Sequence, residues 1–204
     1  MNIDREDLIS VNRETQTDHE ARFGFLSASL DKQNIDVAGV LQKLRNFQVA
    51  IPRWALGAGG TRFGRFSYHG EPSSLEQKIE DVGILHSLTQ TAGAISLHIP
   101  WDIPNDYAAI KELADEKGII FDAVNSNTFQ DQQNAGESYK FGSLSNNSKA
   151  VRQQAIAHNI EVVKIGEKLG SASLTVWLAD GANFPGQRNF QTALLHTEDS
   201  LKEI

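Results

Sequence analysis

The sequence predicts an α/β fold in which four short strands alternate with helices. Four apolar runs, at residues 47–54, 94–102, 119–129 and 172–180, each end in a cluster of polar and aromatic residues. Segments with apolar residues at helical spacing separate these runs. Strands that alternate with helices favour a parallel sheet, and α/β enzymes carry their reactive groups at the carboxyl ends of such strands. The four strand ends are therefore the candidate region for a site.

The composition limits the class of protein. The 204 residues are 40% hydrophobic, which can supply a real core, and the formal charge of −7 without a Lys/Arg run argues against a nucleic-acid partner. With no cysteine, disulfides, thiolate metal sites and a cysteine nucleophile are excluded. No apolar run approaches the roughly 18 residues of a membrane span, and the charged N-terminus lacks a signal-peptide core. We expect a cytoplasmic protein with no membrane partner.

Residues 1–46 are expected to form helices outside the sheet, with Asp36 capping the second of them. The first strand then runs to Trp54. After it, three glycines within residues 57–60 require an unusual backbone path or a close approach to another group. The glycine spacing matches neither the P-loop nor the dinucleotide fingerprint, which favours a loop that presents Arg62 and Phe63 to a pocket or a neighbouring subunit.

The remaining elements follow from caps and periodicity. Ser73 or Ser74 is expected to cap a helix with an apolar stripe from residue 75 to 88, and a short helix spans 107–117 before Gly118. Residues 130–147 form the longest irregular stretch, and loops of that length are usually functional or disordered. A helix starting at Ser148 and closed by Gly170 leads to the fourth strand, and residues 189–204 form the last helix.

Two architectures fit four successive strand–helix units. One is half of a (β/α)₈ barrel, which typically needs about 250 residues. The other is an open parallel sheet, which needs helices on both faces and a phosphate-binding turn after its first strand.

His98 is the sharpest candidate for chemistry. It lies in Leu97-His-Ile-Pro-Trp-Asp102, where a strand gives way to a proline-bearing loop. A neutral imidazole there could hydrogen-bond a substrate oxygen or shuttle a proton, with Asp102 close enough in sequence to orient it. The alternative is a histidine bonded to a carbonyl of a neighbouring strand.

The tryptophans mark the same strand ends. Trp54, Trp101 and Trp177 are the three tryptophans of the chain, each at or near the end of a different strand, and Phe129 has the corresponding place on the third. Flat apolar walls suit a sugar or another polyol with CH faces, whereas core packing is the alternative role for each ring.

Carboxylates at the strand ends are sparse. Asp122 is expected to be buried against a helix, and Asp180 fits a turn as well as a ligand position. No paired-carboxylate, H-x-H or H-E-x-x-H motif is present, so the strand ends do not predict a metal site.

Longer strings resemble the L-rhamnose isomerase family, and in particular its broad-specificity bacterial sugar isomerases with a xylose isomerase-like barrel. They lie at residues 54–63, 96–102, 122–129, 138–145 and 174–187, in order over nearly the whole chain. The resemblance implies a (β/α)₈ TIM barrel that interconverts an aldose and a ketose, such as L-rhamnose and L-rhamnulose, at two divalent cations, commonly Mn²⁺. It implies a substrate-contacting role for His98 and a pocket lined by Trp54, Trp101, Phe129 and Trp177. Phe63 resembles the loop aromatic that family members lend to an adjacent subunit.

The family's metal ligands and acid/base groups lie on later strands, and no residue here matches them. We therefore expect residues 1–204 to be a single incomplete domain, with N-terminal helices over 1–46 and half a TIM barrel over 47–204. It would supply the substrate pocket without the metal ligands, be inactive alone, and form a homo-oligomer, as the tetramers of complete family members do. The alternatives are a metal-free carbohydrate-binding module and an inactive truncated fragment.

Overall fold

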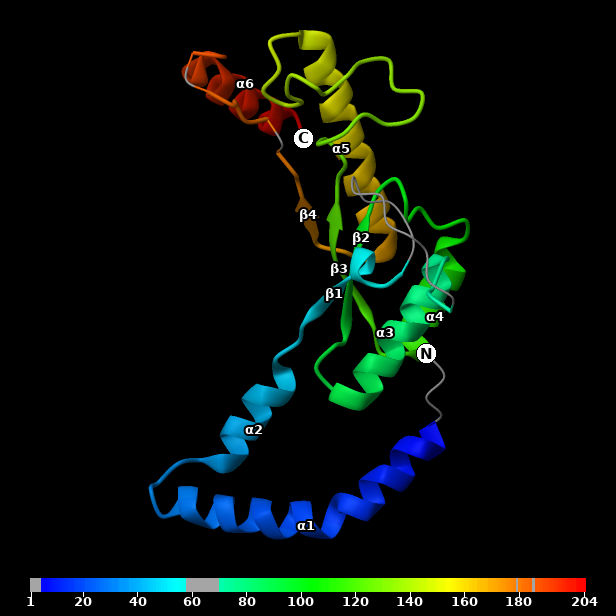
Figure 1. Ribbon diagram of the computed structural model, residues 1–204, viewed down its shortest axis with the longest axis vertical. Coiled ribbons are helices and arrows are strands. Elements are labelled where there is room, and N and C mark those ends of the chain that lie inside the picture. Colours follow the sequence, from blue (N-terminus) through cyan, green and yellow to red (C-terminus); the bar gives the residue numbers. More distant parts are fainter. Residues whose placement is uncertain (1–4, 58–69, 179, 185) are drawn as a thin grey trace.

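A parallel sheet of four strands forms the centre of the molecule. The computed structural model describes residues 5–57, 70–178, 180–184 and 186–204. Within them the strands are β1 (Ala50–Pro52), β2 (Ala94–His98), β3 (Ile120–Asn125) and β4 (Ser173–Thr175), paired in the order β1-β2-β3-β4. Every neighbouring pair is parallel (Figure 1). The predicted α/β class with a four-stranded parallel sheet is confirmed.

The strand order distinguishes the two predicted architectures. A doubly wound sheet reverses its strand order and carries helices on both faces. Here the order follows the chain, and α3 (Leu75–Thr89), α4 (Tyr107–Glu116) and α5 (Lys149–Leu169) lie on one side of the sheet (Figure 1). This is the arrangement of successive βα units in a singly wound barrel.

The main core lies between these three helices and the sheet. Ile95 and Leu97 of β2 are fully buried, and Val124 of β3 is 2% exposed. Their helical partners in the same cluster are Ile79, Val82, Ile110, Ala114, Val162, Ile165 and Leu169. The opposite face is open: Ile120 is 64% exposed, and Asp122 is also exposed with its carboxylate accepting a hydrogen bond from Ser96 Oγ. The expectation that Asp122 packs against a helix is wrong, because alternation along β3 turns it to the uncovered face.

The outer strands are shorter than predicted. The run at residues 47–54 pairs only over β1, and the 3₁₀ helix η1 (Arg53–Ala55) follows at once. Pro52 has no N–H to donate, and β1 is an edge strand with a single partner, so the ladder ends there. The run at residues 172–180 pairs only over β4. Trp54 and Trp177 consequently lie beyond the ends of their strands.

The predicted helix caps are present in most cases. The Asp36 carboxylate accepts the Gly39 N–H ahead of α2 (Val37–Asn46), and Ser74 forms a capping box with Gln77 ahead of α3. Gly170 ends α5 with a φ of 84°, the left-handed conformation that glycine adopts easily. Ser148 precedes α5 without a side-chain capping bond, whereas Asn189 caps the last helix, α6 (Phe190–Glu203).

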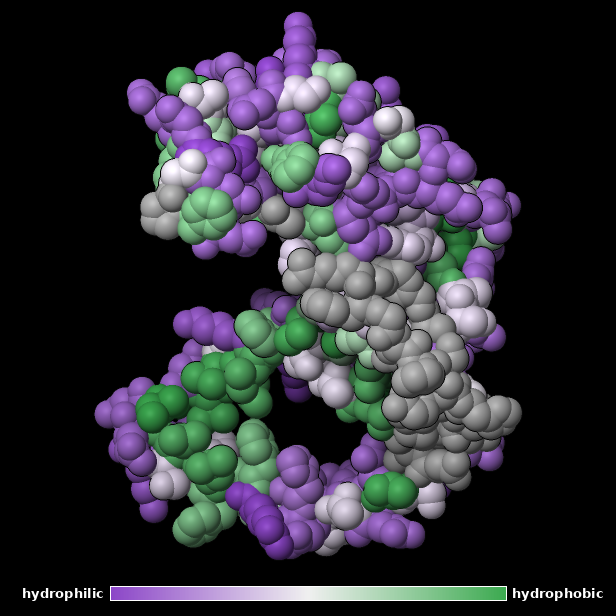
Figure 2. All heavy atoms as spheres, turned by 45° about the horizontal axis from the view of Figure 1, so that its top comes forward, coloured by the Kyte–Doolittle hydropathy of each residue, from purple (hydrophilic) through white to green (hydrophobic). Residues whose placement is uncertain are grey.

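The N-terminal helices form an arm. α1 (Arg5–Asp31) and α2 extend away from the sheet (Figure 1), and α2 has no buried residue. Apolar side chains gather over this arm in the space-filling view (Figure 2), among them Val40, Leu44 and Phe47, which are 45%, 58% and 64% exposed. In the part of the chain that the structure describes, no helix is both long and apolar enough to cross a membrane.

Candidate functional site

Five of the six predicted site residues come together at the carboxyl ends of the strands. We call His98, Trp54, Trp101, Phe129 and Trp177 the aromatic cage. His98 is the last residue of β2 and its ring lies at the centre, with centroids 5.5 Å from Trp54, 4.7 Å from Trp101 and 5.5 Å from Phe129. Trp177 joins through Phe129, at 6.0 Å. Phe63 lies outside the described residues, as does Arg62.

The cage has a buried centre and more accessible walls. His98 is 5% exposed, whereas Trp54, Trp101 and Phe129 are half-buried and Trp177 is 47% exposed. Edge-to-face contacts of this kind hold aromatic rings in fixed relative orientations. Because the walls keep part of their faces free, a flat apolar surface of a ligand can stack on them.

The His98 imidazole is neutral at pH 7. Its pKa is lowered to about 4, first by burial and then by the positive charge of Arg53, while a hydrogen bond to the Ser126 backbone opposes both effects. Nε2 is buried without a hydrogen-bond partner among the described residues, so we assign the Ser126 bond, and with it the proton, to Nδ1. Nε2 is then a hydrogen-bond acceptor in the middle of the cage.

Asp102 does not orient the imidazole, in contrast to the prediction. One carboxylate oxygen, Oδ2, accepts the His98 backbone N–H at 2.7 Å and forms a salt bridge with Arg53 Nε. Both side chains of the pair are almost fully buried, at 2% and 1% exposure. Burial raises the pKa of Asp102, and the charge of Arg53 and the His98 N–H act in the opposite direction.

Arg53 and Lys78 were not recognised in the sequence. Arg53 follows Pro52 in η1, and its guanidinium lies over the Trp101 ring with Cζ 5.8 Å from the centroid. Lys78 of α3 is 3% exposed. Its pKa is lowered mainly by burial and also by the positive charge of Arg53. One signal in the sequence could have identified Arg53, namely the acidic residue Asp102 shortly after the neighbouring strand β2. Lys78 borders the apolar stripe of its helix, where a lysine usually extends to solvent.

Polar residues at the end of β3 support the other side of the cage. Asn125 donates from Nδ2 to Leu97 O at 2.8 Å and accepts from Trp177 Nε1 at 3.1 Å, which ties the fourth strand end to the second. His158 of α5 accepts the Asn127 N–H at 3.0 Å, and burial lowers its pKa. These contacts fix the backbone that leads into Phe129.

Asp180 has a structural position. Its carboxylate accepts four hydrogen bonds, from the backbone N–H and hydroxyl groups of Ser143 and Ser145, at 2.6 to 2.9 Å. Arg188 Nη1 donates to the Asp180 carbonyl oxygen at 2.5 Å. The loop at residues 130–147 is thereby anchored to the segment after β4, and Leu144 within it is fully buried.

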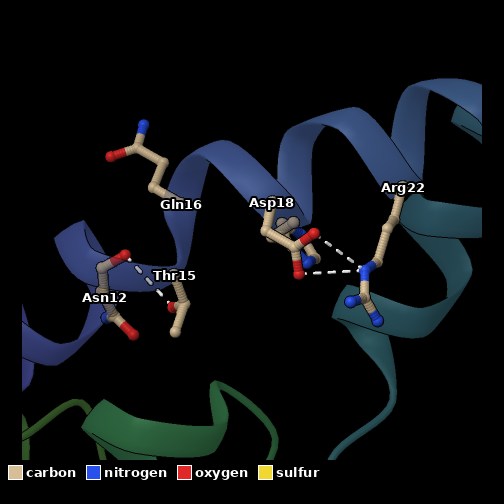
Figure 3. Close-up of a pocket in the computed structure, with 6 residues that line it drawn as sticks. Asn12, Thr15, Gln16, Asp18 and Arg22 are labelled. Atoms are coloured by element: carbon tan, nitrogen blue, oxygen red, sulfur yellow. Dashed lines mark hydrogen bonds and ion pairs between the residues drawn. The ribbon is translucent and has the colours of Figure 1, made fainter.

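The described side chains do not form a metal site. Across residues 5–57, 70–178, 180–184 and 186–204, no group of three or more His, Asp or Glu side chains lies close enough to hold a metal ion. The hollow beside α1 does not have the features of a binding site. It is lined by a single exposed helix (Figure 3), and its Asp18–Arg22 ion pair joins residues one turn apart.

Comparisons with known proteins identify relatives over the whole chain. No protein-family model matches it. A probable sugar isomerase of Rhizobium meliloti (strain 1021) is 46% identical over 203 residues, which cover all of this chain and 45% of that protein. A probable sugar isomerase of Mesorhizobium japonicum is 45% identical over 193 residues, 95% of this chain and 45% of that protein. The chain thus spans somewhat less than half the length of these relatives.

Solved structures show a more distant likeness. Two crystal structures of D-psicose 3-epimerase, one in the presence of D-fructose and one from Clostridium cellulolyticum H10 with D-tagatose, each have a TM-score of 0.46. Their sequence identities to this chain are 16% and 17%. The matched parts cover 63% and 65% of this chain and 41% and 42% of the epimerases.

Proposed function

We propose that this chain forms the substrate-pocket half of an aldose–ketose isomerase that acts on L-rhamnose or a related monosaccharide. The aromatic cage around His98 is the observation that carries this proposal. It combines apolar ring faces with one polar acceptor at the position where α/β barrels place substrates. The names of the two relatives, both probable sugar isomerases, support the same class of reaction.

The walls of the cage select the shape of the ligand. A sugar presents CH groups on one face and hydroxyl groups at its edges, so the half-buried rings of Trp54, Trp101 and Phe129 take the CH face. Burial of that face removes water from the reacting carbons, which strengthens every polar contact inside the pocket.

His98 Nε2 receives one sugar hydroxyl. With the Nδ1 proton assigned to the hydrogen bond with the Ser126 backbone, Nε2 accepts a hydrogen bond that the sugar hydroxyl donates. An imidazole with a pKa of about 4 holds a proton poorly at pH 7. Its role is therefore to position the sugar during ring opening by accepting a hydrogen bond near O1 or O5.

The divalent cations of the proposed reaction need ligands other than the described residues of this chain. The described His, Asp and Glu side chains do not fit a metal ion, so none of them receives a ligand role. When bound, such cations would polarise the sugar carbonyl during isomerisation. What this chain contributes is binding, orientation and exclusion of water.

Complementation tests the proposal. We would co-express this chain with the segment of the Rhizobium meliloti relative that lies beyond the aligned 45%, add Mn²⁺ and measure conversion of L-rhamnose to the ketose. Turnover is expected for the pair, and none for either part alone. His98→Ala should abolish turnover, whereas His19→Ala, on the exposed α1, should not change it. Turnover by this chain alone, or an active pair that is indifferent to His98→Ala, would contradict the proposal.

A metal-free carbohydrate-binding module is the second candidate. The observation in its favour is that the five residues of the cage all belong to this chain and contact one another, with Trp177 also bonded to Asn125. The two functions differ in one measurable respect. A binding module binds the sugar but does not convert it, whether it is alone or co-expressed with the remaining segment of the relative. Excess chelator leaves its affinity for the sugar unchanged.

A further inference from the structure

A single carboxylate oxygen holds two strand ends together. Asp102 Oδ2 accepts both the Arg53 Nε–H and the His98 backbone N–H, and the Asp102 N–H returns to the His98 carbonyl oxygen at 3.1 Å. The turn between His98 and Asp102, which carries Trp101, is closed at both ends by these bonds. The ladder between β1 and β2 ends earlier, at the pair Pro52 and Ser96. The salt bridge therefore extends the connection between the two strands into the region of the cage.

Arg53 is connected to both tryptophans of this region. Trp54 is its neighbour in η1, so the direction of the arginine side chain fixes the turn of backbone that carries Trp54. Its guanidinium also lies over the Trp101 ring. A planar guanidinium donates in a fixed direction and stacks on an aromatic face, which a lysine cannot do. Two of the three rings that contact His98 thus share one support.

Stability alone does not explain this pair. Arg53 and Asp102 are 1% and 2% exposed, and within the described part of the chain Arg53 Nη2 is buried without a hydrogen-bond partner. Lys78 places a second basic group nearby, and its pKa is lowered by burial and by Arg53. Replacing a buried ion pair by well-packed apolar side chains is often neutral or stabilising, whereas removing one partner is strongly destabilising. A buried ion pair whose desolvation cost is high and which lies beside the cage points to a role in orienting its neighbours.

We propose that Arg53 and Asp102 are positioning residues that set the orientation of Trp54 and Trp101 around His98. This inference depends on the proposed function in one respect, namely that the rings oriented by the ion pair bind a sugar. Trp177 serves as an internal reference, because the described contacts of its indole are with Asn125 and Phe129 and not with the ion pair. The salt bridge should therefore control two of the three tryptophans.

The test combines the double variant Arg53→Met/Asp102→Leu with NMR of the three indole N–H groups, each assigned by a Trp→Phe variant. The apolar pair should still unfold cooperatively in urea, with a midpoint lowered by the loss of the acceptor for the His98 N–H. The Trp54 and Trp101 indole resonances should shift, with that of Trp177 unchanged. Cooperative unfolding with all three resonances unmoved would overturn the inference, as would a shift confined to Trp177.

A second variant decides the outcome if the double variant does not fold. Arg53→Lys keeps the charge but loses the planar donor, so it should fold and shift the Trp54 and Trp101 resonances alone. Unmoved resonances in a folded Arg53→Lys protein would overturn the inference. L-rhamnose affinity, measured on the same samples, should fall about tenfold in either folded variant. If the wild type does not bind the sugar, the proposed function fails, but the resonance shifts still decide the role of the pair.

Discussion

The imidazole of His98 and the indole of Trp101 lie edge to face, with ring centroids 4.7 Å apart and planes inclined at 72°. This contact places the neutral histidine inside an aromatic enclosure at the end of β2. Three aromatic rings contact the imidazole, and its protonation would leave a cation with little access to water. The stability of the fold should therefore depend on the protonation state of His98.

The first prediction concerns pH. The folded pKa of His98 is about 4 and its ordinary value is 6.5, so the unfolded state takes up a proton first as the pH falls. The contribution of His98 to stability is complete above pH 6.5 and is lost between pH 6.5 and 4, by roughly 3 kcal/mol in total. Urea unfolding at a series of pH values measures it. His98→Gln should flatten the decline, the exposed control His19→Gln should not, and equal slopes in all three proteins would refute the assignment.

The second prediction concerns Trp177 and Asn125. Trp177→Phe removes the donor to Asn125 Oδ1 and leaves a buried acceptor unpaired, which should cost about 1–3 kcal/mol of unfolding free energy. A double-mutant cycle with Asn125→Ala separates this bond from the loss of ring area. The coupling energy should be about 1 kcal/mol. Strictly additive losses would mean that the indole N–H does not hold the strand ends together.

The third prediction concerns the loop at residues 130–147. Asp180→Asn removes the charge and turns an amide N–H₂ toward the donors of Ser143 or Ser145, so at least one donor loses its acceptor. Hydrogen exchange of the Ser143 and Ser145 amides should accelerate at least tenfold, with stability lowered by about 1–3 kcal/mol. Gln133→Ala, at an exposed position of the same loop, is the control. Unchanged exchange at both serine amides in Asp180→Asn would show that the anchor lies elsewhere.

The fourth prediction compares two helical glycines. A Cβ at Gly166 of α5 would lie 2.9 Å from Val124 Cγ2, and the branched valine has few rotamers with which to move away. Gly166→Ala should therefore destabilise by about 1 kcal/mol despite its better helix propensity, since overpacking costs about 1–3 kcal/mol.

Gly24 of α1 supplies the control for that comparison, because nothing lies within 4 Å of its Cβ position. Gly24→Ala should stabilise α1 by about 0.5–1 kcal/mol, because alanine has the better helix propensity. Adding Val124→Ala to Gly166→Ala should produce a loss smaller than the sum of the single losses. If Gly166→Ala stabilises as Gly24→Ala does, the close packing of α5 on β3 is wrong.

Much of the fold could be predicted because its signals are local. The caps at Asp36 and Ser74 and the glycine after α5 each involve residues within one turn, and the three helices against the sheet follow from apolar spacing. The edge strands were overestimated because pairing depends on a partner strand and not on apolarity alone. Their reduced length leaves Trp54 in η1 and Trp177 in the irregular segment after β4, and both still belong to the cage.

The candidate site divides in the same way. The positions of the aromatic residues at strand ends predicted that they would be close, since parallel strands end at one edge of the sheet. The partners of Asp102 could not be predicted, because Arg53 is 49 residues away in sequence and its burial depends on tertiary packing. Ordinary expectations place arginine and lysine in water. Arg53 and Lys78 were therefore missed, and Asp102 was assigned to the ring of His98 when it binds the backbone.

Titration of this chain with L-rhamnose, followed by tryptophan fluorescence in the presence of chelator, tests the sugar pocket most directly. The three tryptophans of the chain all belong to the cage, so the signal reports on no other region. We predict a saturable change in emission that persists in His19→Ala and is lost in His98→Ala. A flat titration of the folded wild type, or an identical response from wild type and His98→Ala, would contradict the assignment of the aromatic cage as a sugar-binding site.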